Sequence, residues 1–205
     1  MISSQTWLTH PMKLMGDTID LLSLEESHFE PLFEGAKDKR IWEFFPFDGS
    51  DRNRFILHYT GTLADREKGN HYPFVIFHKQ ENKIIGSTSL YDIHLKDRNL
   101  EIGWTWLHPD YWATDINTEC KYLLLTYCFE TLKCVRVQFR TNSLNHRSQK
   151  AIQKIGATFE GVLRKNKIRD DGTIRSSVYY SIIDEEWDSV RQGLRSQIER
   201  KRQLK

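Results

Sequence analysis

The sequence has little that would suggest a disulfide scaffold, a metal site or a membrane segment. Its three cysteines, Cys120, Cys128 and Cys134, form no CxxC pair and have no histidine spacing typical of structural zinc. Free thiols in odd number fit a reducing compartment, so we expect a cytoplasmic protein. No apolar run approaches the roughly 18 residues that a membrane-spanning helix needs. Residues 1–16 also lack a signal-peptide pattern.

An excess of charge of one sign is also missing. The 205 residues carry 30 basic and 28 acidic side chains, a formal charge of +2, so no strong overall field draws the chain to nucleic acid or to a membrane. Only five prolines occur, and no linker rich in Pro, Gly or Ser divides the chain. A single domain over residues 1–205 is therefore expected. A chain of this length buries enough surface to fold without disulfides.

Hydrophobic periodicity predicts a mixed α+β fold. We expect an irregular lead-in over residues 1–17 and a charged helical tail over residues 184–205. Between them the pattern predicts strands at 18–24, 71–78, 83–94, 99–108, 134–141, 158–168 and 173–183. Helices are predicted at 25–38, 51–68, 114–132 and 145–155. The short connections among the three strands before residue 108 indicate an antiparallel meander.

The junction after the strand at 99–108 is a candidate anion site. The letters WTWLHP run through DYWATDIN into the next helix. Amides at a helix start point outward and carry partial positive charge, so a phosphate group fits there. An ordinary strand-to-helix connection looks the same, and this segment alone favours that alternative.

Four short motifs in a fixed order carry a more specific signal. They are E-I-G-W at Glu101–Trp104, N-x-E-x-K-x-L-L-L at Asn117–Leu125, N-x-x-S with K-I-G-A-x-x-E-G-x-L-R within Asn145–Arg164, and D-G with Y-x-x-x-x-x-E-W between Asp171 and Trp187. With these motifs, residues 21–187 resemble the GNAT acetyltransferases, and specifically their RimJ/RimL-like branch. The resemblance implies a central mixed, mostly antiparallel sheet that is flanked by helices. It also implies that this sheet is splayed between its fourth and fifth strands, residues 99–108 and 134–141.

The resemblance further implies acetyl-CoA as cosubstrate. Its pantetheine arm is expected to contact Asn145 and to pair with the backbone of Trp106, Leu107 and His108. Its pyrophosphate is expected on the amides of Ala113, Thr114, Asp115, Ile116, Asn117 and Thr118. The chain departs here from the family pattern R/Q-x-x-G-x-G/A, because the three key positions hold Trp112, Asp115 and Asn117. An Asp carboxylate beside a diphosphate would repel it unless the side chain were turned away.

Acetyl transfer to an amine needs a base, a donor for the oxyanion and a proton for the departing thiolate. The resemblance implies Glu101 as the base, acting through water, and its apolar neighbours would raise its pKa. A strand glutamate in a salt bridge is the alternative. Ser148 is the candidate acid or thiol contact, although an ordinary first-turn serine looks the same. The oxyanion donor is expected to be the backbone amide near Leu107 or His108.

These observations predict an N-acetyltransferase that moves an acetyl group to a primary amine by direct attack in a ternary complex. The acceptor is a protein N-terminus or a small-molecule amine, and the sequence does not choose between them. The first two helices and the hairpin at 158–183 are expected to recognise it. The aromatic residues within 42–47 either line its pocket or anchor the core. Surface acids are candidates to attract a cationic amine: Asp48, Asp51, Asp92 and Asp97.

Two other classes of function stay open on the sequence alone. The missing glycines and Asp115 favour a non-catalytic acyl-CoA-binding or protein-interaction module on the same fold. The basic tail from Arg191 onward suggests a contact to RNA or a ribosome, against which the nearly neutral overall charge argues. We expect no metal, no membrane partner and no nucleic acid as the main partner. The chain is expected to be a monomer or a homodimer.

Overall fold

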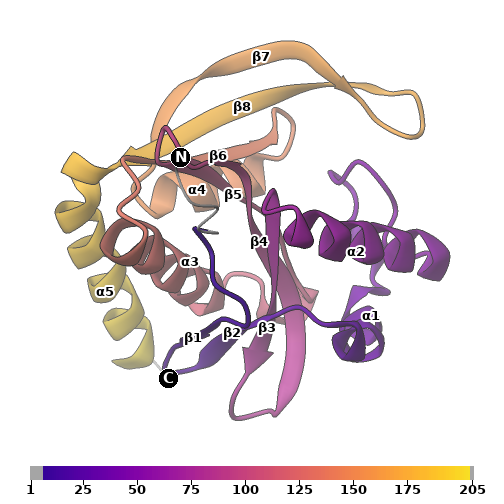
Figure 1. Ribbon diagram of the computed structural model, residues 1–205, viewed down its shortest axis with the longest axis horizontal. Coiled ribbons are helices and arrows are strands. Elements are labelled where there is room, and N and C mark those ends of the chain that lie inside the picture. Colours follow the sequence, from indigo (N-terminus) through magenta and orange to yellow (C-terminus); the bar gives the residue numbers. More distant parts are fainter. Residues whose placement is uncertain (1–6, 204–205) are drawn as a thin grey trace, which may run out of the picture.

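One eight-stranded sheet organises the computed structural model, which describes residues 7–203 (Figure 1). The strands run in the order β1-β2-β3-β4-β5-β6-β8-β7, and each neighbouring pair is antiparallel except β5 with β6. Their bounds are β1 (Lys13–Met15), β2 (Ile19–Ser23), β3 (His71–His78), β4 (Lys83–His94), β5 (Asn99–Leu107), β6 (Arg136–Asn142), β7 (Thr158–Ile168) and β8 (Ile174–Ile183). The predicted mixed, mostly antiparallel sheet is confirmed.

Helices cover both faces of this sheet. They are α1 (Phe29–Ala36), α2 (Arg52–Glu67), α3 (Ile116–Thr126), α4 (His146–Lys154) and α5 (Trp187–Gln203). Side chains of α1 and α2 form one apolar cluster, which includes Trp106 of β5. Those of α3 and α5 form another, which includes Leu107. Because neighbouring residues of a strand face opposite sides, the end of β5 is held from both faces.

The centre of the sheet is splayed between β5 and β6. Their parallel pairing covers only Asn99–Glu101 against Arg136–Gln138. β5 nevertheless continues to Leu107 and β6 to Asn142. Beyond Glu101 the edge of β5 therefore no longer pairs with β6, and a gap opens at the middle of the sheet. This confirms the splay between the fourth and fifth predicted strands, which are β5 and β6 here because β1 precedes them.

The structure differs from the sequence expectations at several element ends. The lead-in contains β1, a strand of three residues that is too short to show a period in the sequence. The helix expected from residue 25 begins as a 3-10 turn and becomes α-helical at Phe29. The helix expected from residue 114 begins at Ile116, and its last turn is a π-helix over Tyr127–Thr131. The rest of the lead-in before residue 7 lies outside the described residues.

The C-terminal segment is packed more closely than a solvated tail would be. A 3-10 turn at Asp184–Glu186 leads into α5. Trp187, Leu194 and Ile198 are buried, and the Trp187 ring stacks on Phe129 with centres 5.3 Å apart. The segment thus completes the core on the α3 face. Within residues 7–203, no helix is long and apolar enough to cross a membrane.

Candidate functional site

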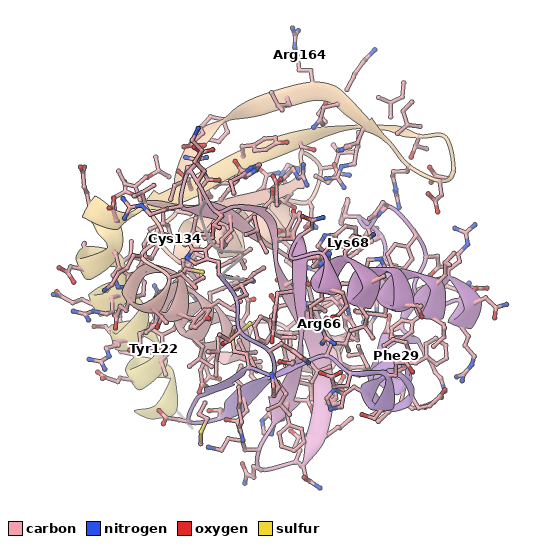
Figure 2. All side chains as sticks on the ribbon, viewed as in Figure 1. Phe29, Arg66, Lys68, Tyr122, Cys134 and Arg164 are labelled. Atoms are coloured by element: carbon pink, nitrogen blue, oxygen red, sulfur yellow. The ribbon has the colours of Figure 1, made fainter. Side chains whose placement is uncertain are left out.

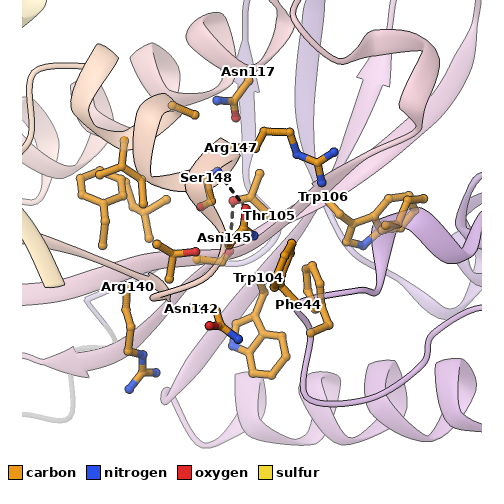
Figure 3. A pocket seen from close by; sticks show the side chains of 18 of the residues that line it. Phe44, Trp104, Thr105, Trp106, Asn117, Arg140, Asn142, Asn145, Arg147 and Ser148 are labelled. Atoms are coloured by element: carbon orange, nitrogen blue, oxygen red, sulfur yellow. Dashed lines mark hydrogen bonds between the residues drawn. The ribbon is translucent and has the colours of Figure 1, made fainter. Parts of the chain in front are cut away.

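A cavity of about 520 Å³ occupies the gap between β5 and β6 (Figure 3). Its wall combines the end of β5, the start of α3, the first turns of α4, the tip of the β7–β8 hairpin and the aromatic loop 41–46. Figure 3 shows Asn117 and Arg147 toward one end, and Arg140 and Asn142 toward the other. A long ligand lying through the gap would thus touch both the start of α3 and the side chains of β6.

Half of the predicted site residues reach the wall of this cavity. Those that line it are Trp106, Leu107, Ala113, Asn117, Asn145 and Ser148. Those that do not are Glu101, His108, Thr114, Asp115, Ile116 and Thr118. Several of the second set are buried behind the wall, namely Glu101, Asp115, Ile116 and Thr118. The side chains of the second set can therefore act at the cavity only through a neighbour.

The loop before α3 holds its shape without glycine. Ala113 has a φ of +62°, in the left-handed region that glycine adopts most readily. The Thr114 hydroxyl donates to the carbonyl of Tyr111 at 2.7 Å and accepts from the amide of Ile116 at 3.3 Å. Asp115 is 2% exposed and lies behind the wall. Its carboxylate is therefore not presented to the cavity, where it would repel an anion.

Trp112 and Asn145 stand on two sides of the cavity end that adjoins the start of α3, and hydrogen bonds hold each of them in place. The indole N–H of Trp112 donates to the Leu107 carbonyl at 2.9 Å. The guanidinium of Arg147 stands 3.6 Å from the centre of the Trp112 ring, a cation–π contact that brings positive charge to the wall. Asn145 caps α4 by accepting from the amide of Ser148 at 3.0 Å. Asn145 thus has the helix-capping role that its position in the sequence suggests, and it also lines the cavity.

The end of β5 contains a bulge. Pairing with β4 shifts register between Ser87 and Ser89, and Trp104 opposite has a φ of +50°. This backbone conformation is strained for a bulky side chain. Beyond the bulge, the amide of His108 donates to the Ile85 carbonyl at 2.9 Å. Because successive amides of a strand point to alternate edges, the amide of Leu107 faces the gap, whereas that of His108 faces β4.

Glu101 lies at the last residue where β5 pairs with β6, and its side chain has no exposed surface. The Tyr91 hydroxyl donates to one carboxylate oxygen, and the amide of Gln138 donates to the other at 2.9 Å. The Arg140 guanidinium is 3.4 Å from the carboxylate. Burial raises the pKa of Glu101, and the charge of Arg140 opposes that rise only in part.

Tyr91 connects this buried carboxylate to the cavity. Its hydroxyl is also 3.2 Å from Arg140, and both Tyr91 and Arg140 line the wall, whereas Glu101 does not. Burial and the neighbouring negative charge of Glu101 raise the pKa of Tyr91 well above its ordinary value, so it remains a proton donor. Neither Tyr91 nor Arg140 was among the site residues predicted from the sequence. The alternation of side chains along the strand at 83–94 indicates only where Tyr91 lies on the sheet. It does not show that Tyr91 contacts Glu101, which is on another strand.

Lys121 is a third residue whose position the sequence did not reveal. It is buried on α3 and lines the cavity, with its Nζ 2.6 Å from the Thr105 hydroxyl and 3.5 Å from that of Thr88. No carboxylate of residues 7–203 lies within ion-pair distance of it. Burial lowers its pKa. The one sequence feature that could have identified Lys121 is its position on the side of the predicted helix that faces the core, where a lysine is rare.

Replacing Lys121 by Met should stabilise the fold. The two hydroxyls stay bonded to each other at 2.8 Å, so the substitution leaves no polar group unpartnered and removes a buried charge, a gain of about 1–2 kcal/mol at pH 7. Because burial lowers the folded-state pKa of Lys121, the unfolded chain binds more protons at this residue above that pKa, and the cost of burying the amine falls toward pH 10. In urea unfolding, the stability advantage of Lys121→Met over the wild type should therefore be smaller at pH 10 than at pH 7; an advantage of equal size at both pH values would contradict the assignment.

Two histidines beside Trp104 make the fold sensitive to acid. The rings of His58 and His71 are 4.9 and 6.4 Å from that of Trp104, and burial lowers the pKa of each to about 4. Between pH 6.5 and 4 the unfolded chain therefore binds more protons. The free energy of unfolding falls as the pH falls, by up to about 3 kcal/mol per histidine. Denaturant titrations at pH 6.5 and 4.5 measure this loss, and the His58→Gln/His71→Gln double variant should lose less. An equal loss in both proteins would exclude the histidines as its cause.

The aromatic residues within 42–47 have both of the roles expected for them: some line the cavity and others pack in the core. Phe44 and Phe45 line the cavity, whereas Trp42 is buried and donates from its indole to the Ala36 carbonyl at 2.7 Å. Phe47 packs between Trp42 and His58. None of the surface acids considered for a cationic amine lines the wall: Asp48, Asp51, Asp92 and Asp97. In the part of the chain that the structure describes, no group of His, Cys, Asp and Glu is arranged to hold a metal ion.

Comparisons with known proteins agree with this geometry. A family model described as an acetyltransferase (GNAT) domain matches residues 19–158. YnaD of Bacillus subtilis strain 168, an uncharacterized N-acetyltransferase, is 24% identical over 167 residues, which are 80% of this chain and 92% of YnaD. The fold is similar to that of a T. thermophilus protein described as an acetyltransferase, whose crystal structure matches with a TM-score of 0.83. The two chains are 30% identical, and the match covers 93% of this chain and 99% of the other. Mycobacterium smegmatis RimJ in complex with CoA-disulfide has the same fold, with a TM-score of 0.75 and 19% identity over 87% of this chain and 88% of RimJ.

Proposed function

Because the chain belongs to the GNAT acetyltransferase family, we propose that it transfers the acetyl group of acetyl-CoA to a primary amine by direct attack in a ternary complex. The observation that carries this proposal is the unpaired edge of β5 beyond Glu101. It opens onto a cavity with a helix start at one end and, in its wall, Tyr91, whose hydroxyl donates to the buried carboxylate of Glu101. The acceptor is a protein N-terminus or a small-molecule amine. The RimJ structure with CoA-disulfide supports the choice of a CoA thioester as donor.

The residues at this end of the cavity fit a CoA molecule. The edge of β5 from Gly103 to Leu107 offers backbone groups to the amides of a pantetheine arm, as a neighbouring strand would. The start of α3, with Ala113 in the left-handed region, offers amides to a diphosphate. Arg147 on Trp112 adds a positive charge there. Acetyl-CoA supplies an acetyl group activated as a thioester.

Tyr91 and Glu101 act together as the base in this proposal. The amine lies against the Tyr91 hydroxyl, gives it a proton, and Tyr91 passes its own proton to the Glu101 carboxylate. The raised pKa of Glu101 makes that carboxylate a better proton acceptor than an exposed glutamate. This relay replaces the water expected from the sequence, because Glu101 is fully buried and Tyr91 already occupies the hydrogen-bonding position that such a water would take.

The other roles go to groups along the β5 edge and its neighbours. The amide of Leu107 is the proposed donor to the negative charge that develops on the thioester oxygen. Lys121 adds positive charge beside Thr105, two residues before Leu107. Ser148 faces the cavity from the first turn of α4 and is the proposed proton donor to the departing thiolate. That donor is the least demanding role, because a thiol with a pKa near 8.5 leaves readily.

The proposal is tested by a coupled measurement of products. Purified protein is incubated with acetyl-CoA and a panel of primary amines, and released thiol is quantified beside the acetylated amine by mass spectrometry. The proposal predicts equal amounts of thiol and amide for at least one amine. Thiol release that occurs without an amide product, or the absence of both products across peptide and small-molecule amines, would contradict it.

A further inference from the structure

The cavity wall carries six basic side chains and, among the described residues, no acidic one. Two of them, Lys121 and Arg147, come from α3 and α4 near the proposed diphosphate site. The other four come from β6 and the β7–β8 hairpin: Arg140, Lys167, Arg169 and Arg175. Figure 3 shows Arg140 far from Arg147 and from the start of α3. We call Arg140, Arg169 and Arg175 the arginine end of the cavity.

Two members of the arginine end, Arg169 and Arg175, form no ion pair with a carboxylate of residues 7–203. Arg175 makes two long contacts, 3.5 Å to the Phe44 carbonyl and 3.4 Å to the Ser177 hydroxyl. Its Nε and that of Arg169 are buried and have no hydrogen-bond partner within residues 7–203. Asp170, the acid next to Arg169 in sequence, is engaged by Arg54 at 3.2 Å instead. Donors held in this way are ready to bind an acceptor that comes from outside the chain.

Like charges are crowded here. Burial lowers the pKa of Arg175, and the charges of Arg140 and Arg169 lower it further. Glu101 is 3.4 Å from Arg140 but lies on the buried side of it. The arginine end therefore has more positive than negative charge in partly desolvated surroundings, which an anion would relieve. A guanidinium binds a carboxylate or a phosphate through two parallel hydrogen bonds.

The arginine end is fixed next to the proposed reaction site. Arg140 bridges the two, since its guanidinium is 3.2 Å from the Tyr91 hydroxyl. The hairpin tip is held against the aromatic loop by the amide of Asp170, which donates to the Pro46 carbonyl at 3.4 Å. Phe44, Phe45 and Trp104 supply apolar surface along the same part of the wall. A ligand that spans from Tyr91 to the hairpin is thus in contact with side chains along its length.

We propose that the acceptor is an amine that also carries a carboxylate or a phosphate, which Arg169 and Arg175 bind while the amine faces Tyr91. This inference rests on the proposed function and adds the chemical class of its second substrate. It reverses the expectation of a cationic acceptor held by surface acids, because those acids are outside the cavity and the groups inside are basic. An acceptor with a second positive charge would be repelled.

Binding of matched acceptors to the protein saturated with desulfo-CoA tests the proposal. Calorimetry compares phosphoethanolamine with ethanolamine, and a C-terminally amidated hexapeptide that begins Ser-Glu with one that begins Ser-Gln. We expect the anionic member to bind at least about tenfold more tightly in one pair, and the pair that responds identifies a small-molecule or a peptide source. Equal affinity within both pairs, including undetectable binding throughout, would overturn the proposal.

Variants of the arginine end assign the effect to its residues. Arg175→Gln and Arg169→Gln should each weaken binding of the anionic member about tenfold, with the affinity for acetyl-CoA unchanged within about twofold. Arg175→Glu should favour a Ser-Lys peptide over the Ser-Glu peptide. Arg164 of β7 points outward from the hairpin (Figure 2) and does not line the cavity, so Arg164→Gln is the matched control and should change nothing.

The outcomes separate this inference from the proposed function. Loss of acetyl-CoA affinity in Arg175→Gln would mean that the arginine end binds phosphates of the donor, and the inference would be wrong while the function stands. Acetyl transfer to neutral and anionic amines at equal kcat/KM would also contradict the inference and leave the proposed function standing. Failure of the wild type to bind acetyl-CoA or to release thiol with any amine would instead refute the proposed function itself.

Discussion

Glu101→Gln should lower kcat about 10²- to 10³-fold and leave the affinity for acetyl-CoA unchanged. The substitution keeps the size of the side chain but removes the negative charge that accepts the proton from Tyr91 in the proposed relay, and a positioned base contributes rate factors of this order. Tyr91→Phe should have a similar effect, because it removes the hydroxyl that donates to Glu101 and that we propose to contact the amine. Steady-state kinetics with the acceptor found in the product assay, beside calorimetry with acetyl-CoA, measure both quantities.

A glutamate outside the cavity provides the control. Glu160 is also in an ion pair with an arginine, Arg136, and accepts from the Ser181 hydroxyl at 2.7 Å. There the Arg136 contact lowers the carboxyl pKa, the opposite of the shift at Glu101. Glu160→Gln should therefore leave kcat unchanged. If Glu101→Gln retained full turnover, or lost acetyl-CoA affinity in proportion to kcat, Glu101 would have a structural role only.

Gly86→Ala should destabilise the fold and disrupt the site together. A Cβ at residue 86 would lie 2.2 Å from the Trp106 carbonyl oxygen and 3.1 Å from the Leu107 Cα. These are backbone atoms of the strand segment proposed to hold pantetheine, so the clash is relieved only by moving β5. We expect a loss of about 3 kcal/mol in the free energy of unfolding and at least a tenfold weaker affinity for acetyl-CoA. Urea unfolding and calorimetry measure the two effects.

Gly61 of α2 is the control for the same chemical change. A Cβ built there meets no atom within 4 Å apart from its chain neighbours and the nearby backbone of its own helix, and alanine is favoured over glycine inside a helix by about 1 kcal/mol. Gly61→Ala should therefore raise stability slightly and leave acetyl-CoA affinity as it is. A Gly86→Ala variant with normal affinity and stability would show that β5 tolerates displacement, and the role given to its backbone would be wrong.

Local patterns in the sequence located most of the fold. The strands from residue 71 to residue 108 and the helix that Asn145 caps are found within a few residues of the expected places, because alternation and capping depend on residues close in sequence. The splay was expected only through the family resemblance. Its physical cause is the end of β5–β6 pairing after Glu101, which depends on two strands more than 30 residues apart in the chain and has no local signal.

The site could be predicted only in part for the same reason. The start of α3 was found because a helix start is a local feature, and Trp106, Leu107 and Ala113 do reach the cavity. The partners that define the chemistry of Glu101 come from other strands: Tyr91 from β4, Gln138 and Arg140 from β6. The basic wall of the cavity was not predicted, because exposed acids such as Asp92 are visible in the sequence, whereas the convergence of Arg140 with Arg175 requires the pairing of β6 with β8.

Calorimetric titration with acetyl-CoA, desulfo-CoA and adenosine 3′,5′-bisphosphate tests most directly whether the gap between β5 and β6 is a CoA site. The wild type should bind one molecule of acetyl-CoA with a Kd on the order of micromolar, desulfo-CoA with similar affinity, and the nucleotide more weakly because it lacks the arm that pairs with β5. Ala151 of α4 lines the cavity, and Ala151→Trp should fill it and abolish binding of both CoA compounds. Absence of binding by the wild type, or equal binding by Ala151→Trp, would contradict the account.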